Sequence, residues 1–352
     1  MSALTIMYTR EFRQRLLGLL WSQWSSLGVY GYVSDTRKET GYIIDPDALF
    51  LFTLPITRYD ARLWDEVMDW LHRHGHLINV QRMKTLQRNY GLGQDALIAP
   101  VAARLSTTKT YQLKWKGLCR TTGSTPQEPL FFDADGIPVP VVGPTDPFYA
   151  DAGFLRSPMQ LRGMTKPFSQ TSSAAMLLRM RALFGISLRA ELVCALSSTD
   201  ALYASEAARM IDYDSKSVQA ACVDMSASGF IGIQPSEGRE KNYYLKPSLA
   251  SAMTADSRRP IWLRWGALYN TLERYYAVLV TVASVTDPVI AASEMRKCVH
   301  EMRQLVVQSG IQWMMDMNDE LRGEDYVREV HEAMQLLCDK LDGSLLSKAL
   351  GT

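Results

Sequence analysis

Residues 203–248 read "YASEAARMIDYDSKSVQAACVDMSASGFIGIQPSEGREKNYYLKPS", and this stretch has the most regular local pattern in the chain. Small side chains dominate Ala204–Ala208, where they allow a second helix to approach closely. Asp212 and Asp214 follow, and aspartate favours turns and helix caps. The pattern therefore predicts a short helix, a tight polar turn and the start of a second helix.

The second helix is predicted over Ser215–Ser228. Its apolar side chains Val218, Cys222 and Met225 recur at the spacing of one buried helical face. Gly229 suits the left-handed conformation that commonly ends a helix. We therefore expect the opposite face of this helix, which begins with serine and lysine, to meet solvent or a ligand.

Two β-rich segments complete the pattern. Phe230–Ile233 alternates as a strand, Pro235–Lys241 is a polar loop, and Tyr243–Leu245 returns as the partner strand. Another helix, predicted over Leu188–Leu196, comes before the small-residue helix. The predicted order is a helix, a helix-turn-helix and a β-hairpin.

This order resembles the winged-helix transcription regulators of bacteria, over about residues 187–248. The resemblance implies that the start of the second helix faces the major groove of DNA and that the hairpin loop, the wing, meets phosphates. The residues that it places in contact with DNA are Ser215, Lys216, Ser217 and Gln219 on the helix, and Arg239 and Lys241 on the wing.

The charge of the same region weakens that expectation. Residues 187–250 carry six Lys and Arg against eight Asp and Glu, whereas a DNA-reading domain is usually basic on its contact face. Asp212, Asp214 and Asp224 would repel phosphates unless they turn away. The alternative is a non-catalytic adaptor or antitoxin-like protein whose winged helix docks another protein.

The first third of the chain has clear helix start signals. Asp45–Asp47 contains a proline suited to a first helical turn, Asp60 precedes an amphipathic stretch, and Asn79 can cap a third helix that ends at Gly91. Three helices joined by short turns are typical of a trihelical unit.

This part of the chain is also basic, since residues 1–120 carry 16 Lys and Arg against 10 Asp and Glu. The helix after Asn79 is predicted to expose Arg82, Lys84 and Arg88. Lys84 and Arg88 are four residues apart and can share a face. We expect this pair to supply phosphate contacts that an acidic winged helix lacks.

The whole sequence predicts a mainly α protein. A first helix is expected over residues 10–27 with Thr9 as its N-cap, and residues 120–172, rich in Pro and Gly, are expected to form a partly packed extended connection. The predicted organisation is a helical N-terminal domain (1–119), this connection (120–172), a winged helix-turn-helix (173–250) and a helical dimerisation or packing segment (251–352).

Other functional classes find little support in the sequence. The five cysteines are scattered, "HRHGH" (His72, His74, His76) lacks further metal ligands, and no nucleotide-binding or hydrolase motif occurs. No apolar run approaches the length of a membrane span. We therefore expect a cytoplasmic, non-enzymatic protein without cofactor or metal. Its expected function is that of a homodimeric, sequence-specific regulator of transcription, more specifically a repressor, with double-stranded DNA as its partner.

Overall fold

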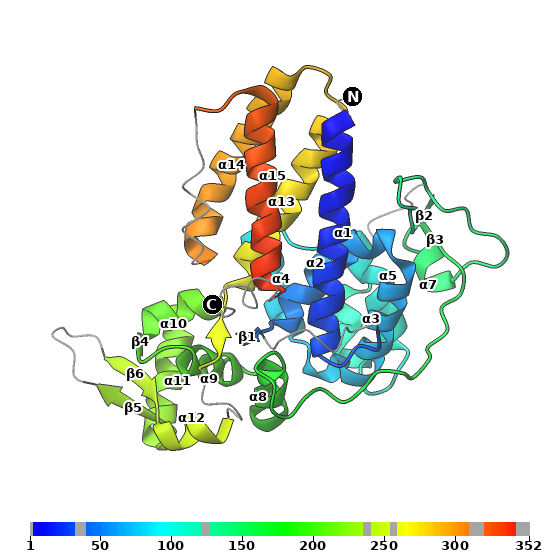
Figure 1. Ribbon diagram of the computed structural model, residues 1–352. Helices are drawn as coiled ribbons and strands as arrows, with labels where there is room; N and C mark the ends of the chain where they lie inside the picture. Colours follow the sequence, from blue (N-terminus) through cyan, green and yellow to red (C-terminus); the bar gives the residue numbers. More distant parts are fainter. Residues whose placement is uncertain are drawn as a thin grey trace.

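The computed structural model describes residues 3–31, 40–120, 127–234, 241–253, 259–309 and 320–342. Helices account for most of these residues and the strands are short, so the predicted mainly α fold is confirmed. Figure 1 shows a group of long helices standing over two smaller helical parts. The helices are α1 (Ala3–Ser26), α2 (Pro46–Ile56), α3 (Ala61–His74), α4 (Val80–Tyr90), α5 (Asp95–Ser106), α6 (Gln112–Trp115), α7 (Pro147–Ala150), α8 (Met176–Phe184), α9 (Leu188–Ser197), α10 (Ala204–Ile211), α11 (Ser215–Ala227), α12 (Pro247–Met253), α13 (Trp265–Ala283), α14 (Pro288–Ser309) and α15 (Gly323–Leu341).

The strands form three small sheets. β1 (Tyr42–Ile43) pairs in parallel with β7 (Ile261–Trp262), and β2 (Glu128–Pro129) pairs in parallel with β3 (Phe154–Leu155). The third sheet has the order β4-β6-β5 and is antiparallel. Its strands are β4 (Leu202–Tyr203), β5 (Ile231–Gln234) and β6 (Asn242–Leu245).

The long helices α13, α14 and α15 pack together with α1, which comes from the other end of the sequence. α1 packs on α13 and α15, and α14 packs on both α13 and α15 (Figure 1). The rings of Phe12 in α1 and Tyr275 in α13 are nearly perpendicular, with their centroids 4.7 Å apart, and Gln23 accepts a hydrogen bond from the Tyr269 hydroxyl. The C-terminal helices therefore share one hydrophobic core with the N-terminal helices.

The helix caps predicted for the N-terminal part are confirmed. Asp45, Asp60 and Asn79 each accept hydrogen bonds from backbone N–H groups in the first turns of α2, α3 and α4. The cap predicted at Thr9 is wrong, because α1 begins at Ala3 and the Thr9 hydroxyl donates to the Thr5 carbonyl inside the helix. A threonine inside a helix commonly satisfies its hydroxyl in this way.

The described part of the Pro/Gly-rich connection, residues 127–172, runs along α3 as an extended arm. Tyr149 is fully buried and accepts a hydrogen bond from the Trp64 indole, while Arg156 donates two hydrogen bonds to Asp65. Farther along, the Asp69 carboxylate accepts backbone N–H groups of residues 163–165. These contacts fix the arm on the helical part.

A second hydrophobic core is formed mainly by residues 176–253, together with Ile43 of β1 and Trp262 of β7. Helices α9, α10 and α11 pack on one another, and the sheet β4-β6-β5 lies beside them. Val218, Cys222 and Met225 point into this core, as their spacing predicts. None of the described helices is long and apolar enough to cross a membrane.

Candidate nucleic-acid interface

Helix α11 is held by its cap and its buried face. The Asp214 side chain accepts the N–H of Ser217, and this hydrogen bond fixes the first turn. Val218 is 0% exposed, whereas Ser215, Lys216 and Gln219 are exposed on the same turns. The helix therefore presents a polar N-terminal surface because its other side is anchored in the core.

A groove of about 560 Å³ runs between this surface and the hairpin. Ser215, Lys216, Gln219 and Lys241 all line it, so the structure brings together four of the residues predicted to contact DNA. Gln219 is oriented by its side-chain N–H, which donates to the Tyr243 hydroxyl at 2.8 Å. We call this hollow the α11 groove.

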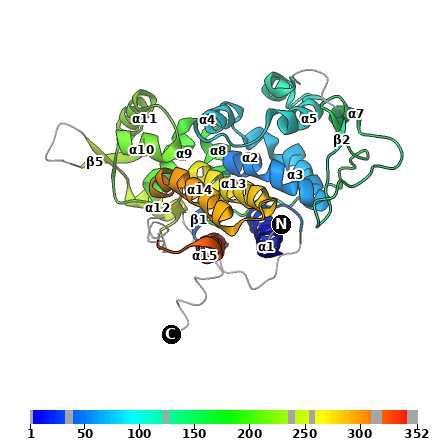
Figure 2. The ribbon, with the colours of Figure 1, turned by 90° about the horizontal axis from the view of Figure 1, so that it is seen from above.

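A second hollow, of about 600 Å³, separates α10 and the start of α11 from α4, and we call it the interdomain groove. Ser205 and Ser215 line both hollows, so the two hollows adjoin at these residues. Figure 2 shows α10, α11 and α4 along the same edge of the molecule. Arg88 lines the interdomain groove from the side of α4.

The remaining predicted site residues lie elsewhere. Lys84 is exposed on α4 but does not line the interdomain groove, and its ammonium lies toward Gly117. Ser217 is partly buried under the cap made by Asp214. Arg239 lies outside the described residues.

The acidic residues beside α11 have partners of their own. The Asp214 carboxylate caps the helix, and Asp224 forms an exposed ion pair with Arg189 at 2.8 Å. Asp212 turns inward, and its side chain is 5% exposed. These three aspartates, which argue against nucleic acid in the sequence, are therefore paired with protein groups in the structure.

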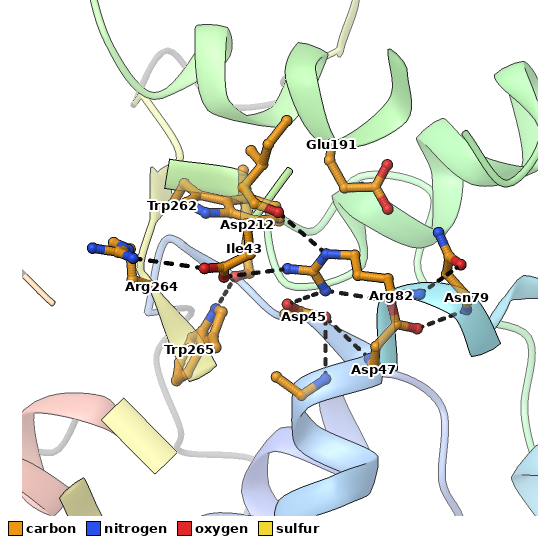
Figure 3. Close-up of polar contacts among 12 residues, drawn as sticks. Ile43, Asp45, Asp47, Asn79, Arg82, Glu191, Asp212, Trp262, Arg264 and Trp265 are labelled. Carbon is orange, nitrogen blue, oxygen red and sulfur yellow. Dashed lines mark hydrogen bonds and ion pairs between the residues drawn. The ribbon is translucent and has the colours of Figure 1, made fainter. Parts of the chain in front are cut away.

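Arg82, which the sequence predicted to be exposed, is only 3% exposed, so that prediction is wrong. Its guanidinium lies 2.5 Å from the Asp45 carboxylate, 3.3 Å from Asp47 and 4.0 Å from Asp212 (Figure 3). It also donates to the Ile211 carbonyl in the last turn of α10. Arg82 thus connects the start of α2 to the end of α10 and the turn that follows it.

A second buried arginine completes this ionic network. Arg181 of α8 donates to both carboxylate oxygens of Asp47, at 2.8 and 2.5 Å, and to Glu191 of α9. Burial alone would raise the pKa of Asp47, but the attraction of Arg181 and Arg82 outweighs it and holds this pKa below its ordinary value. Asp47 is therefore ionised between two guanidinium groups.

The turn between α10 and α11 is fixed to the rest of the protein by Asp212 and Tyr213. Asp212 has a left-handed backbone (φ 59°), and its carboxylate accepts a hydrogen bond of 2.5 Å from the Tyr90 hydroxyl. Arg264 lies 3.6 Å from the same carboxylate, and Asn79 donates to the Tyr213 hydroxyl. Burial raises the pKa of Asp212, although Arg82, Tyr90 and Arg264 oppose that rise.

Sequence reasoning missed two groove residues on α10, Ser205 and Arg209. Their spacing with Asp212, at i, i+4 and i+7, is a signal for one helical face that could have found them. Nothing local indicated that this face would lie opposite α4.

Comparisons with protein-family models, with curated proteins and with solved structures gave no match. Within the described ranges, no group of three or more His, Cys, Asp or Glu side chains is placed to hold a metal ion. The five cysteines are free thiols.

Proposed function

We propose that this protein binds double-stranded DNA in a sequence-specific manner, as a regulator of transcription and more specifically a repressor, in the cytoplasm. Residues 188–245 act as a winged helix, with α11 as the recognition helix and the β5–β6 hairpin as the wing. The observation that supports this proposal is the pair of adjoining hollows lined by Lys241, Ser215 and Arg88.

The chemistry of the α11 groove suits base recognition. Gln219 uses one N–H on Tyr243, which leaves its second N–H and its carbonyl oxygen for the paired acceptor and donor of adenine. Lys216 and Lys241 line the same groove and can meet phosphates on either side. The hydrogen bond to Tyr243 also limits the rotamers of Gln219 before DNA arrives.

We further propose that the protein is a homodimer, because regulators of this type present two recognition helices about one DNA turn apart. The apolar stripes of α14 and α15 are covered within the chain by α13 and α1. A second copy therefore has to contact another surface. Light scattering of the purified protein measures the oligomeric state.

Selection from a pool of random duplexes, followed by affinity measurements at two salt concentrations, tests the proposed function. We expect an enriched sequence that binds about 10³-fold or more tightly than unrelated duplex. The affinity for the enriched sequence and the affinity for unrelated duplex should both fall as the salt concentration rises, because phosphate contacts release counterions. Absence of any enriched sequence would favour the protein-docking alternative.

Gln219→Ala is expected to weaken binding to the selected sequence by about 1–3 kcal/mol while binding to unrelated duplex changes little, because a bidentate base contact is lost. Ser217→Ala, added to it, is expected to contribute less, since Ser217 is partly buried under its cap. Gln304→Ala on α14, another exposed glutamine, is the control. Equal loss on both kinds of DNA would show that Gln219 does not read bases. A melting curve of each variant checks the fold.

Arg88→Ala is expected to make the fall of affinity with salt less steep. The magnitude of the slope of log affinity against log salt should drop by about 0.9, because one phosphate contact is lost. Lys84→Ala removes the same charge from the same helix but from outside the interdomain groove. We therefore expect Lys84→Ala to leave the slope near that of the parent protein. If the two variants behave alike, net charge and not the groove determines the slope.

A further inference from the structure

The side chains that line the interdomain groove are mostly charged or polar. One wall is polar and comes from α4, and the other comes from α10 and the turn before α11. Apart from Ala208 and the ring of Tyr213, the lining side chains are charged or hydrogen-bonding. They are Asn79, Gln81, Arg82, Thr85, Arg88, Asn89, Ser205, Arg209, Asp212, Asp214, Ser215 and Arg264.

Two exposed arginines line this groove from different helices. Arg88 on α4 and Arg209 on α10 are both exposed, and neither forms an ion pair in the part of the chain that the structure describes. Arg264 lies deeper, with 21% of its side chain exposed, and its guanidinium contacts Tyr90 and Asp212. The guanidinium groups thus approach the groove from three elements.

The acids of the groove do not cancel these cations. Asp212 already interacts with Arg82 as well as Arg264, and Asp214 accepts the N–H of Ser217. The interior of the groove therefore favours an anion that can accept several hydrogen bonds. A phosphate group has this property, and arginine binds it through two parallel N–H bonds.

We propose that the interdomain groove is a phosphate-binding site in which Arg88 and Arg209 hold one phosphate from opposite walls and Arg264 attracts it from below. Asn89 and Ser205 supply neutral hydrogen bonds from the two sides. The phosphate comes either from the DNA backbone beside α11 or from a free nucleotide. The first source rests on the proposed function, whereas the second does not.

The site joins two parts of the protein with separate hydrophobic cores, since α4 belongs to one core and α10 to the other. A bound phosphate therefore ties the helix-turn-helix to the N-terminal helices. The phosphate would thus add a second link to the ion pair between Arg82 and Asp212, which already holds the turn between α10 and α11 in place.

Arg209→Gln in the full chain, with Lys84→Gln as the charge-matched control, tests the site with two measurements. The first is the slope of log affinity for duplex DNA against log salt. If the phosphate belongs to the DNA backbone, we expect Arg209→Gln to reduce the magnitude of this slope by about 0.9. The second is the melting temperature with millimolar ATP, without magnesium. If the phosphate belongs to a nucleotide, ATP is expected to raise this temperature in the parent protein and not in Arg209→Gln.

Either result supports the site and identifies the source of the phosphate. The site is overturned if two results are found together. Arg209→Gln has the same salt slope as the parent protein, and ATP either leaves the melting temperature of the parent protein unchanged or raises that of Arg209→Gln equally. If the parent protein binds no duplex at all, the proposed function fails, and the ATP measurement alone decides on the site. Unchanged melting of the ligand-free variants shows that the fold is intact.

Discussion

Asp47→Ala is expected to lower the free energy of unfolding by about 3–5 kcal/mol, because it leaves a buried arginine without its closest anion. Asp47 is 0% exposed, and Arg181 donates to both of its carboxylate oxygens. It also accepts the backbone N–H of Asn79, so the change removes an acceptor at the start of α4. Urea unfolding followed by circular dichroism measures the effect.

Asp224→Ala is the control for this prediction. Asp224 also pairs with an arginine, Arg189, but both side chains are largely exposed. Exposed pairs contribute about 0–1 kcal/mol, so little change is expected. A loss of similar size in the two variants would mean that the buried position of Asp47 has no special importance.

The same carboxylate makes stability depend on pH. The pKa of Asp47 is lower in the folded protein than in the unfolded chain. Its contribution is therefore fully present above the unfolded pKa, and it is lost as the pH falls through the folded pKa. We expect Asp47→Ala to have a flatter stability profile at acid pH than the parent protein.

Val218→Asp is expected to unfold residues 188–245, because it buries an unpaired carboxylate in the second core. Val218 is 0% exposed among α9, α10 and the sheet. An unpaired charge in such a position costs several kcal/mol or more, which is comparable with the whole stability of a small domain. Labelling of the buried Cys222 thiol, located by mass spectrometry, reports on the opening of this part.

Val223→Asp makes the same chemical change on the same helix, but Val223 is 50% exposed. We expect this variant to protect Cys222 as well as the parent protein does. Rapid labelling of Cys222 in both variants would mean that any aspartate in α11 disrupts the helix. Slow labelling in both would mean that Val218 is not anchored in the core.

The sequence predicted those features that depend on neighbours along the chain. Asp45, Asp60 and Asn79 cap their helices through N–H groups two or three residues away, so the signal is local. The buried face of α11 follows from a spacing within one helix. These features needed no knowledge of how the helices pack.

Features that depend on distant residues were not predictable in this way. Arg82 was expected in solvent because arginine usually is, yet its partners Asp45 and Asp212 are 37 positions before it and 130 after it. The pairing of β1 with β7 joins Tyr42 to Ile261, and a two-residue strand has no periodicity to detect. The interdomain groove arises in the same way, since α4 and α10 meet only in the folded protein.

The packing of α1 on α13 and α15 has a consequence for synthesis of the protein. The apolar face of α1 around Phe12 leaves the ribosome well before α13 and α15, which cover it and begin at Trp265 and Gly323. The end of α1 near Trp24, in contrast, packs on α2, which follows soon in the chain. At about 5–20 residues per second, the face around Phe12 waits for roughly 15 seconds or longer before its partners are made. The nascent chain therefore passes through a stage that favours aggregation, and we expect its yield to depend on chaperones that bind exposed apolar helices.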